Sequence, residues 1–78
     1  MGRREDLEVY ARRLRVCISH STSLIDSLNE LLLMQDLFQV INTAGEEEIR
    51  RDLQNEERMR ARYETDLRSV DAMIAAEQ

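Results

Sequence analysis

The sequence predicts an all-α fold in which a long amphipathic helix is joined to a second helix. Apolar residues recur at alternating intervals of three and four from Leu7 to Phe38, the heptad pattern of a helix packed on other helices. The composition agrees, because the chain has no proline and only two glycines, and 35% of its residues are charged. We expect one module over residues 1–78, with helices over about 4–41 and 46–75 and a break at 42–45.

The first helix has a wide apolar face with one polar interruption. Its a and d positions are Leu7, Tyr10, Leu14, Cys17, Ser21, Leu24, Leu28, Leu31, Gln35 and Phe38. A second apolar line occupies the adjacent e positions, at Ala11, Ile18, Ile25 and Leu32. A two-stranded coiled coil needs only the narrow a/d line, so this face requires more than one neighbouring helix. The residues from Leu24 to Ile41 form the strongest amphipathic segment and the expected centre of the core.

Residues 17–23 are the part of the first helix least suited to helix formation. Serine and threonine side chains compete for backbone hydrogen bonds, and Ser23 with Asp26 resembles a weak helix start. Either one helix contains a polar layer here or two helices meet at a kink. The heptad register continues unchanged, which favours one continuous helix.

The break at residues 42–45 carries stop and start signals. Thr43 and Glu46 have the spacing of a capping box, and Asn42 tolerates the left-handed conformation that ends a helix. The alternative is a mild disturbance within one long helix. A short connection usually joins antiparallel neighbours, which predicts a helical hairpin.

The second helix has a thin apolar face of its own. Its heptad positions hold Ile49, Leu53, Tyr63, Leu67, Val70 and Ile74, with Glu56 and Arg60 at two further positions of the same line. In a hairpin this helix would cover the e side of the first, around Ile25, Leu32 and Met34. Two hairpins joined through the Leu7–Phe38 line would then form a dimeric four-helix assembly. The alternative is a kinked, extended parallel coiled coil.

Length, net charge and cysteine content limit the classes of function that the sequence allows. A monomeric core of 78 residues would be marginal, so we expect a homodimer. The net charge of −5 argues against nucleic acid as a partner, and the longest apolar run, Leu31 to Met34, is too short to cross a membrane. One cysteine fits a reducing, cytoplasmic location. The sequence contains no catalytic constellation or phosphate-binding loop, so we expect no enzyme.

Cys17 and His20 are the only candidate metal ligands that the pattern suggests. They lie three residues apart and so emerge on one helix face. Two copies brought together in a dimer would supply two cysteines and two histidines, a set that suits tetrahedral zinc. The alternative is that Cys17 packs as a small apolar residue beside a partly exposed His20, without any cofactor.

The stretches Leu7-Glu-Val-Tyr10-Ala-Arg-Arg-Leu14-Arg-Val-Cys17-Ile-Ser-His20 and Leu24-Ile-Asp-Ser-Leu28-Asn-Glu-Leu31-Leu resemble the C-terminal conserved motif of the centrosomin family. Those proteins are large coiled-coil scaffolds of the centrosome. The resemblance covers the first half of the chain. It implies assembly of the pericentriolar matrix, through docking of the motif on itself and on a leucine-zipper segment of the same scaffold protein.

Two functional hypotheses follow. The first is a structural module that self-associates to multimerise a larger scaffold, with a contact formed by Leu7, Tyr10, Leu14, Cys17, Ser21, Leu24, Ile25, Leu28, Leu31, Leu32 and Phe38. The second is an adaptor subunit that binds a foreign partner helix in an apolar groove flanked by Ile25, Leu32 and Met34. The first predicts a dimer in isolation and the second does not.

Overall fold

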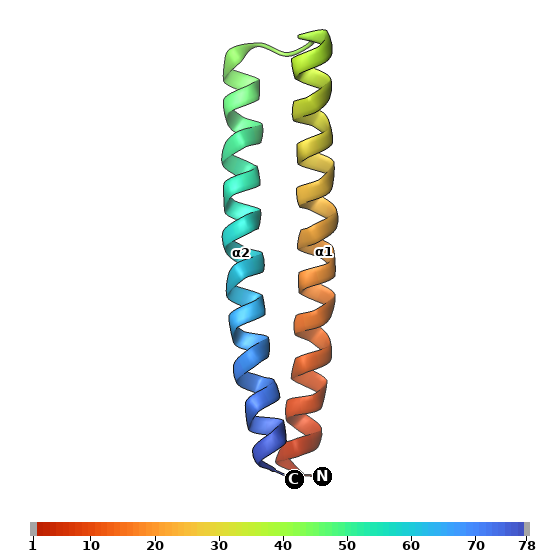
Figure 1. Ribbon diagram of the computed structural model, residues 1–78, viewed down its shortest axis with the longest axis vertical. Coiled ribbons are helices and arrows are strands. Elements are labelled where there is room, and N and C mark those ends of the chain that lie inside the picture. Colours follow the sequence, from red (N-terminus) through yellow and green to blue (C-terminus); the bar gives the residue numbers. More distant parts are fainter. Residues whose placement is uncertain (1, 78) are drawn as a thin grey trace.

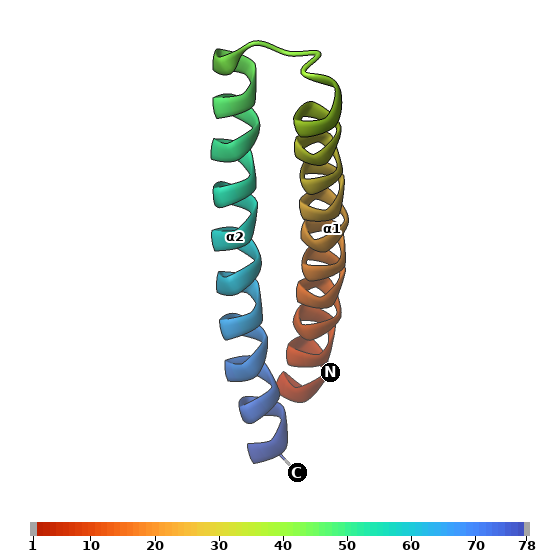
Figure 2. The ribbon, with the colours of Figure 1, turned by 45° about the horizontal axis from the view of Figure 1, so that its top comes forward.

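The protein is a hairpin of two antiparallel α-helices. The structure is a computed structural model that describes residues 2–77. Helix α1 spans Arg3–Phe38 and α2 spans Thr43–Ala76, and the two helices lie side by side with both ends of the chain at one end of the hairpin (Figures 1 and 2). The molecule measures 55 × 15 × 14 Å. The all-α fold is confirmed, and of the two expected forms it is the hairpin.

Helix α1 passes without interruption through residues 17–23. The prediction of one continuous helix is therefore confirmed, although this segment holds four serine and threonine residues. Ser21 is buried on the face that α1 turns towards α2. The heptad register outweighs the weak local helix propensity here, because tertiary packing of an amphipathic face supplies most of a helix's stability.

The connection between the helices lies at residues 39–42, three residues earlier than the expected break at 42–45. Helix α1 ends at Phe38, three residues before the expected boundary, and Gln39 adopts the left-handed conformation with φ 49° and ψ 47°. The side chain of Gln35 holds the loop: its Nε2 donates to the Ile41 carbonyl and its Oε1 accepts from the Ile41 N–H, both at 2.8 Å. The buried Gln35 amide thus provides hydrogen-bond partners for the N–H and the C=O of Ile41, which the turn leaves without backbone partners.

The start of α2 corrects the predicted capping box. Asn42 is the N-cap, with extended backbone, and its Oδ1 accepts a hydrogen bond from the Gly45 N–H at 2.8 Å. Thr43 is instead the first residue of the helix, and the left-handed residue is Gln39 and not Asn42. Asparagine is at least as good an N-cap as threonine, so the cap forms one residue earlier than the T-x-x-E pattern indicated.

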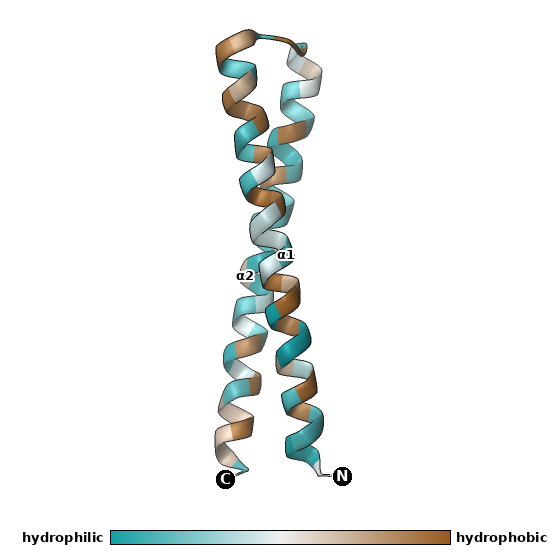
Figure 3. Cartoon of the chain, turned by 90° about the vertical axis from the view of Figure 1, so that its right-hand side faces the viewer, coloured by the Kyte–Doolittle hydropathy of each residue, from teal (hydrophilic) through white to brown (hydrophobic). Residues whose placement is uncertain are grey.

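The two helices pack through heptad positions on both sides. The face of α2 that is buried or partly buried follows one unbroken heptad line: Ile49, Leu53, Glu56, Arg60, Tyr63, Leu67, Val70 and Ile74. On α1 the corresponding line combines the a and e positions: Leu7, Ala11, Leu14, Ile18, Ser21, Ile25, Leu28, Leu32 and Gln35. Apolar and polar bands alternate along both helices in Figure 3. Helix α2 thus covers the e side of α1 at Ile25 and Leu32, as the hairpin prediction required, but it leaves Met34 exposed, which corrects that part of the prediction.

The largest cluster of buried residues lies at the open end of the hairpin. Ala11, Leu14 and Val70 form its centre, and Leu7, Tyr63, Leu67 and Ile74 pack around it. This corrects the expectation that Leu24 to Ile41 would be the centre of the core. Near the loop α2 offers only Ile49 and Leu53 before Glu56 and Arg60, so it cannot cover the most apolar part of α1.

A polar layer separates the open end of the interface from the loop end. Arg60 Nη1 donates to Thr22 Oγ1 at 3.4 Å, which places these two residues at the same height in the hairpin. Glu56 Oε2 is buried and has no hydrogen-bond partner within residues 2–77. A buried carboxylate oxygen without a partner is costly, so this layer weakens the interface that it crosses.

Candidate interaction surface

Helix α2 leaves one heptad line of α1 uncovered. The d-position residues Tyr10, Leu24, Leu31 and Phe38 are 49%, 37%, 52% and 61% exposed, and Cys17 in the same line is partly buried. We call these five residues the exposed stripe. From Tyr10 to Phe38 it extends roughly 40 Å at 1.5 Å per residue, about three quarters of the hairpin's length. A row of large apolar side chains this long is a feature of interaction sites.

Further apolar side chains flank the exposed stripe on the side away from α2. Val9, Val16 and Leu37 occupy c positions of the heptad and Met34 occupies a g position, all exposed, and Ile41 is exposed in the connection that follows α1. In a helix the c, g and d positions are neighbours around the axis. The apolar surface is therefore one flank of α1, widest towards the loop.

A groove between the helices borders the stripe near its middle. Its apolar wall comes from α1, through Leu24, Leu28 and Leu31 with Ser27. Its polar wall comes from α2, through Asp52, Asn55 and Glu56. We call this feature, of about 440 Å³, the acidic groove. It offers apolar contact on one side and two carboxylates on the other, which suits an amphipathic helix with basic residues at its edge.

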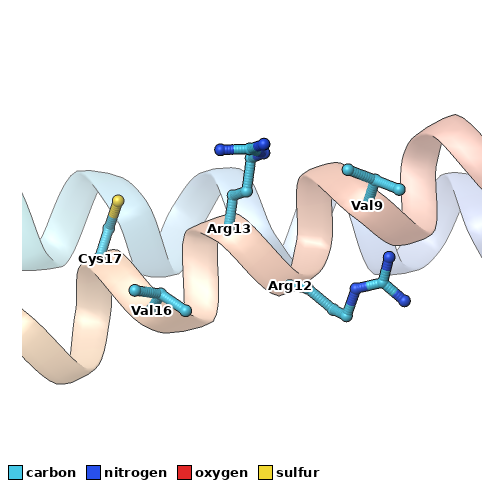
Figure 4. Close-up of a pocket in the computed structure, with 5 residues that line it drawn as sticks. All are labelled: Val9, Arg12, Arg13, Val16 and Cys17. Carbon is cyan, nitrogen blue, oxygen red and sulfur yellow. The ribbon is translucent and has the colours of Figure 1, made fainter.

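A second hollow lies on the outward face of α1 nearer its start. Figure 4 shows its five residues, Val9, Arg12, Arg13, Val16 and Cys17, on one side of α1 with α2 behind. We call it the basic hollow. The two valines supply apolar contact and the two guanidinium groups border it, so its charge is opposite to that of the acidic groove.

A smaller hollow links these two features and contains both predicted metal ligands. Cys17 and His20 line it together with Glu56, and Val16, Ser21, Met59 and Tyr63 complete it. The structure thus places Cys17 and His20 on one face, as their spacing predicted. Within residues 2–77 no three or more of the histidine, cysteine and acidic side chains are arranged to hold a metal ion. A single hairpin therefore presents two candidate ligands here and no complete site.

The residues predicted to contact a second chain divide into two groups. Leu14, Ser21, Ile25 and Leu32 are buried in the hairpin, and Leu7 and Leu28 are partly buried there. Tyr10, Leu24, Leu31 and Phe38 are exposed. The a positions predicted to face another chain thus face α2, because a helix packed on one neighbour buries two adjacent heptad positions, here a and e. Of the predicted contact residues, those at the d positions remain available to a partner, although Cys17 among them is partly buried.

Several residues of this surface were missed by the sequence reasoning. Asp52 and Asn55 border the acidic groove, and Arg12 and Arg13 border the basic hollow. No pattern within either helix marks them, since their role depends on how the two helices pack. For Glu56 a signal existed, because it interrupts an otherwise apolar heptad line.

Comparison with known proteins adds no relative. No family model, no curated protein and no solved structure matches the chain. In residues 2–77 neither helix contains a stretch that is both long and apolar enough to cross a membrane. The surface described above is therefore the main basis for the function.

Proposed function

We propose that this hairpin is a structural module that self-associates through the exposed stripe and so multimerises a larger scaffold. The observation that supports this proposal is the uncovered d line of α1, with Leu24, Leu31 and Phe38 at least 37% exposed over most of the hairpin's length. Such a line is costly to leave in water, because each apolar Å² removed from water contributes about 25 cal/mol. A second hairpin covers it with residues of the same kind.

The thinness of the hairpin's own core supports the same proposal. Within residues 2–77 only five apolar residues are buried, Ala11, Leu14, Ile25, Leu32 and Val70. Small domains with so little buried surface are commonly stabilised by oligomerisation. Association would stabilise the hairpin and at the same time join two copies of whatever scaffold carries it.

The resemblance of residues 7–32 to the centrosomin motif suggests where this module acts. We propose the pericentriolar matrix of the centrosome, with homodimerisation and docking on a leucine-zipper segment of the same scaffold as its two contacts. Leu24, Leu31 and Phe38 are the residues that would carry both contacts. Both would be formed by apolar helix faces.

One leucine pair in α1 allows a matched test. Leu31 lies in the exposed stripe, whereas Leu33 is equally exposed, at 57%, on the opposite flank of the helix. We expect Leu31→Glu to convert a dimer into a monomer, because it places a charge in the apolar contact, while Leu33→Glu leaves the dimer intact. The measurement is solution mass by light scattering after size exclusion, with circular dichroism to show that both variants remain helical.

The outcome also separates the proposal from its alternative. A wild-type chain that is monomeric at high concentration, or a Leu31→Glu variant that is still dimeric, would overturn self-association through this stripe. A folded monomer would instead favour the adaptor function. The groove expected at Ile25, Leu32 and Met34 is not available to a partner, because α2 buries Ile25 and Leu32. The acidic groove is the observation that supports that function instead, because its carboxylates and leucines suit a foreign helix with basic edges.

A further inference from the structure

We propose that two hairpins pair antiparallel, with the loop end of each beside the open end of the other and a two-fold axis crossing α1 near Thr22. This inference rests on the proposed self-association and adds its orientation. It is drawn from the distribution of charge along the hairpin and from the two oppositely charged features beside the exposed stripe.

The net charge of the protein is concentrated in one half of the hairpin. Thr22 and Arg60 lie at the same height, so residues 21–61 make up the loop half and residues 2–20 and 62–77 make up the open half. The loop half holds nine of the sixteen carboxylates but only four of the eleven arginines. The open half holds seven of each. The whole net charge of −5 therefore belongs to the loop half.

Parallel pairing would place two strongly acidic loop halves against each other. Like charges across an interface are unfavourable, and within about 8–10 Å at physiological salt they are only partly screened. Antiparallel pairing places each acidic half beside a neutral one and avoids that repulsion. Charge therefore disfavours the parallel arrangement.

The surface features are also self-complementary in the antiparallel arrangement. The basic hollow, with Arg12 and Arg13, lies in the open half, and the acidic groove, with Asp52 and Glu56, lies in the loop half. The two adjoin the same flank of α1, since Cys17 and Glu56 both line the hollow between them. A two-fold axis near Thr22 brings the basic hollow of each copy towards the acidic groove of the other.

Burial of apolar surface is compatible with this orientation. The exposed stripe runs from Tyr10 to Phe38, and Val9 and Val16 continue the apolar surface into the open half. Both orientations therefore cover the stripe along most of its length. In the antiparallel pair, the apolar loop end of one copy, around Met34 and Phe38, packs on Tyr10 and the valines of the other. Charge then decides between two arrangements that bury similar residues.

The distance between the two loops tests this orientation directly. Thr43 is an exposed residue at the loop, so Thr43→Cys in a Cys17→Ser background provides one spin-label site for each chain. Antiparallel pairing predicts a distance of roughly 50 Å between the two labels, from 1.5 Å per residue on each side of the axis. Parallel pairing predicts less than about 30 Å, twice the 15 Å width of one hairpin. Pulsed electron spin resonance distinguishes these values.

A matched label near the axis serves as the control. Ser23→Cys in the same background lies close to Thr22, so the antiparallel dimer gives a short distance there and a long one at Thr43. A parallel dimer gives short distances at both sites. Solution mass is measured for the wild type and for each variant, which separates loss of pairing from a change of orientation.

Each outcome is decisive. A dimer with a long distance at residue 43 and a short one at residue 23 establishes the antiparallel pair. A dimer with short distances at both sites overturns the orientation and leaves self-association in place. A monomeric wild-type chain overturns both the orientation and the proposed function.

Discussion

Two glutamines of the loop region show how single residues set the end of α1. Gln35 is buried and uses both ends of its amide on the backbone of Ile41, so it fixes the path of the chain out of the helix. Gln39 follows with a positive φ of 49°, and its N–H donates to the Gln35 carbonyl at 2.7 Å. Helices commonly end on a left-handed residue, but glycine is the usual choice, because a side chain makes that conformation unfavourable.

Gln39→Gly is therefore expected to stabilise the hairpin by about 0.5 kcal/mol, since relief of left-handed strain outweighs the added freedom of the unfolded chain. The measurement is the midpoint of thermal unfolding followed by circular dichroism. Gln54→Gly is the matched control: it lies exposed in the interior of α2, and we expect it to cost about 1 kcal/mol. A lower midpoint for Gln39→Gly would contradict the assigned conformation.

At the scale of the helices, stability is uneven along the interface. Ala11, Leu14 and Val70 give the open end a compact apolar cluster, whereas Ser21, Glu56 and Arg60 form a polar layer in its middle. Two ion pairs also join the helices at the open end, Arg15–Asp71 at 3.3 Å and Arg3–Glu77 at 3.6 Å. All four side chains are largely exposed, so these pairs contribute little to stability. The apolar cluster is what holds the open end together.

Replacing Glu56 tests the cost of the polar layer. We expect Glu56→Leu to raise the free energy of unfolding by about 1–3 kcal/mol, because it removes a buried oxygen that lacks a partner and extends the apolar line of α2. Chemical denaturation at several protein concentrations measures this change. Glu57→Leu, one residue along on the exposed face, is the control and should have little effect. An unchanged or lower stability for Glu56→Leu would show that this carboxylate has a favourable partner.

For the whole molecule, orientation and metal binding are linked. A zinc site shared by two chains requires the Cys17 sulfur atoms of both to lie within bonding distance of one ion, as they would in a parallel pair. In the antiparallel pair with its axis near Thr22, the two Cys17 residues are offset by roughly 15 Å along the helix. The four-ligand site considered for the sequence and the antiparallel dimer therefore exclude each other.

We accordingly expect a chelator to leave the mass of the dimer unchanged. Light scattering with and without EDTA measures this, and Cys17→Ser, which removes the thiol without altering the charge, should behave in the same way. A dimer that dissociates on chelation, and in which Cys17→Ser abolishes metal content, would instead support a parallel pair joined through zinc.

The amino-acid sequence was enough to predict the all-α fold and the face of α2 that packs, and to favour a continuous α1 and a hairpin, because each follows from heptad spacing or from a local break. Which part of the wide α1 face stays exposed follows only from the way α2 packs on α1. That choice depends on the angle at which α2 lies against α1, so it buried Leu14 and Ser21, left Leu31 and Phe38 uncovered, and brought Asp52 and Glu56 beside Leu24. Spacing within one helix contains no information about that angle.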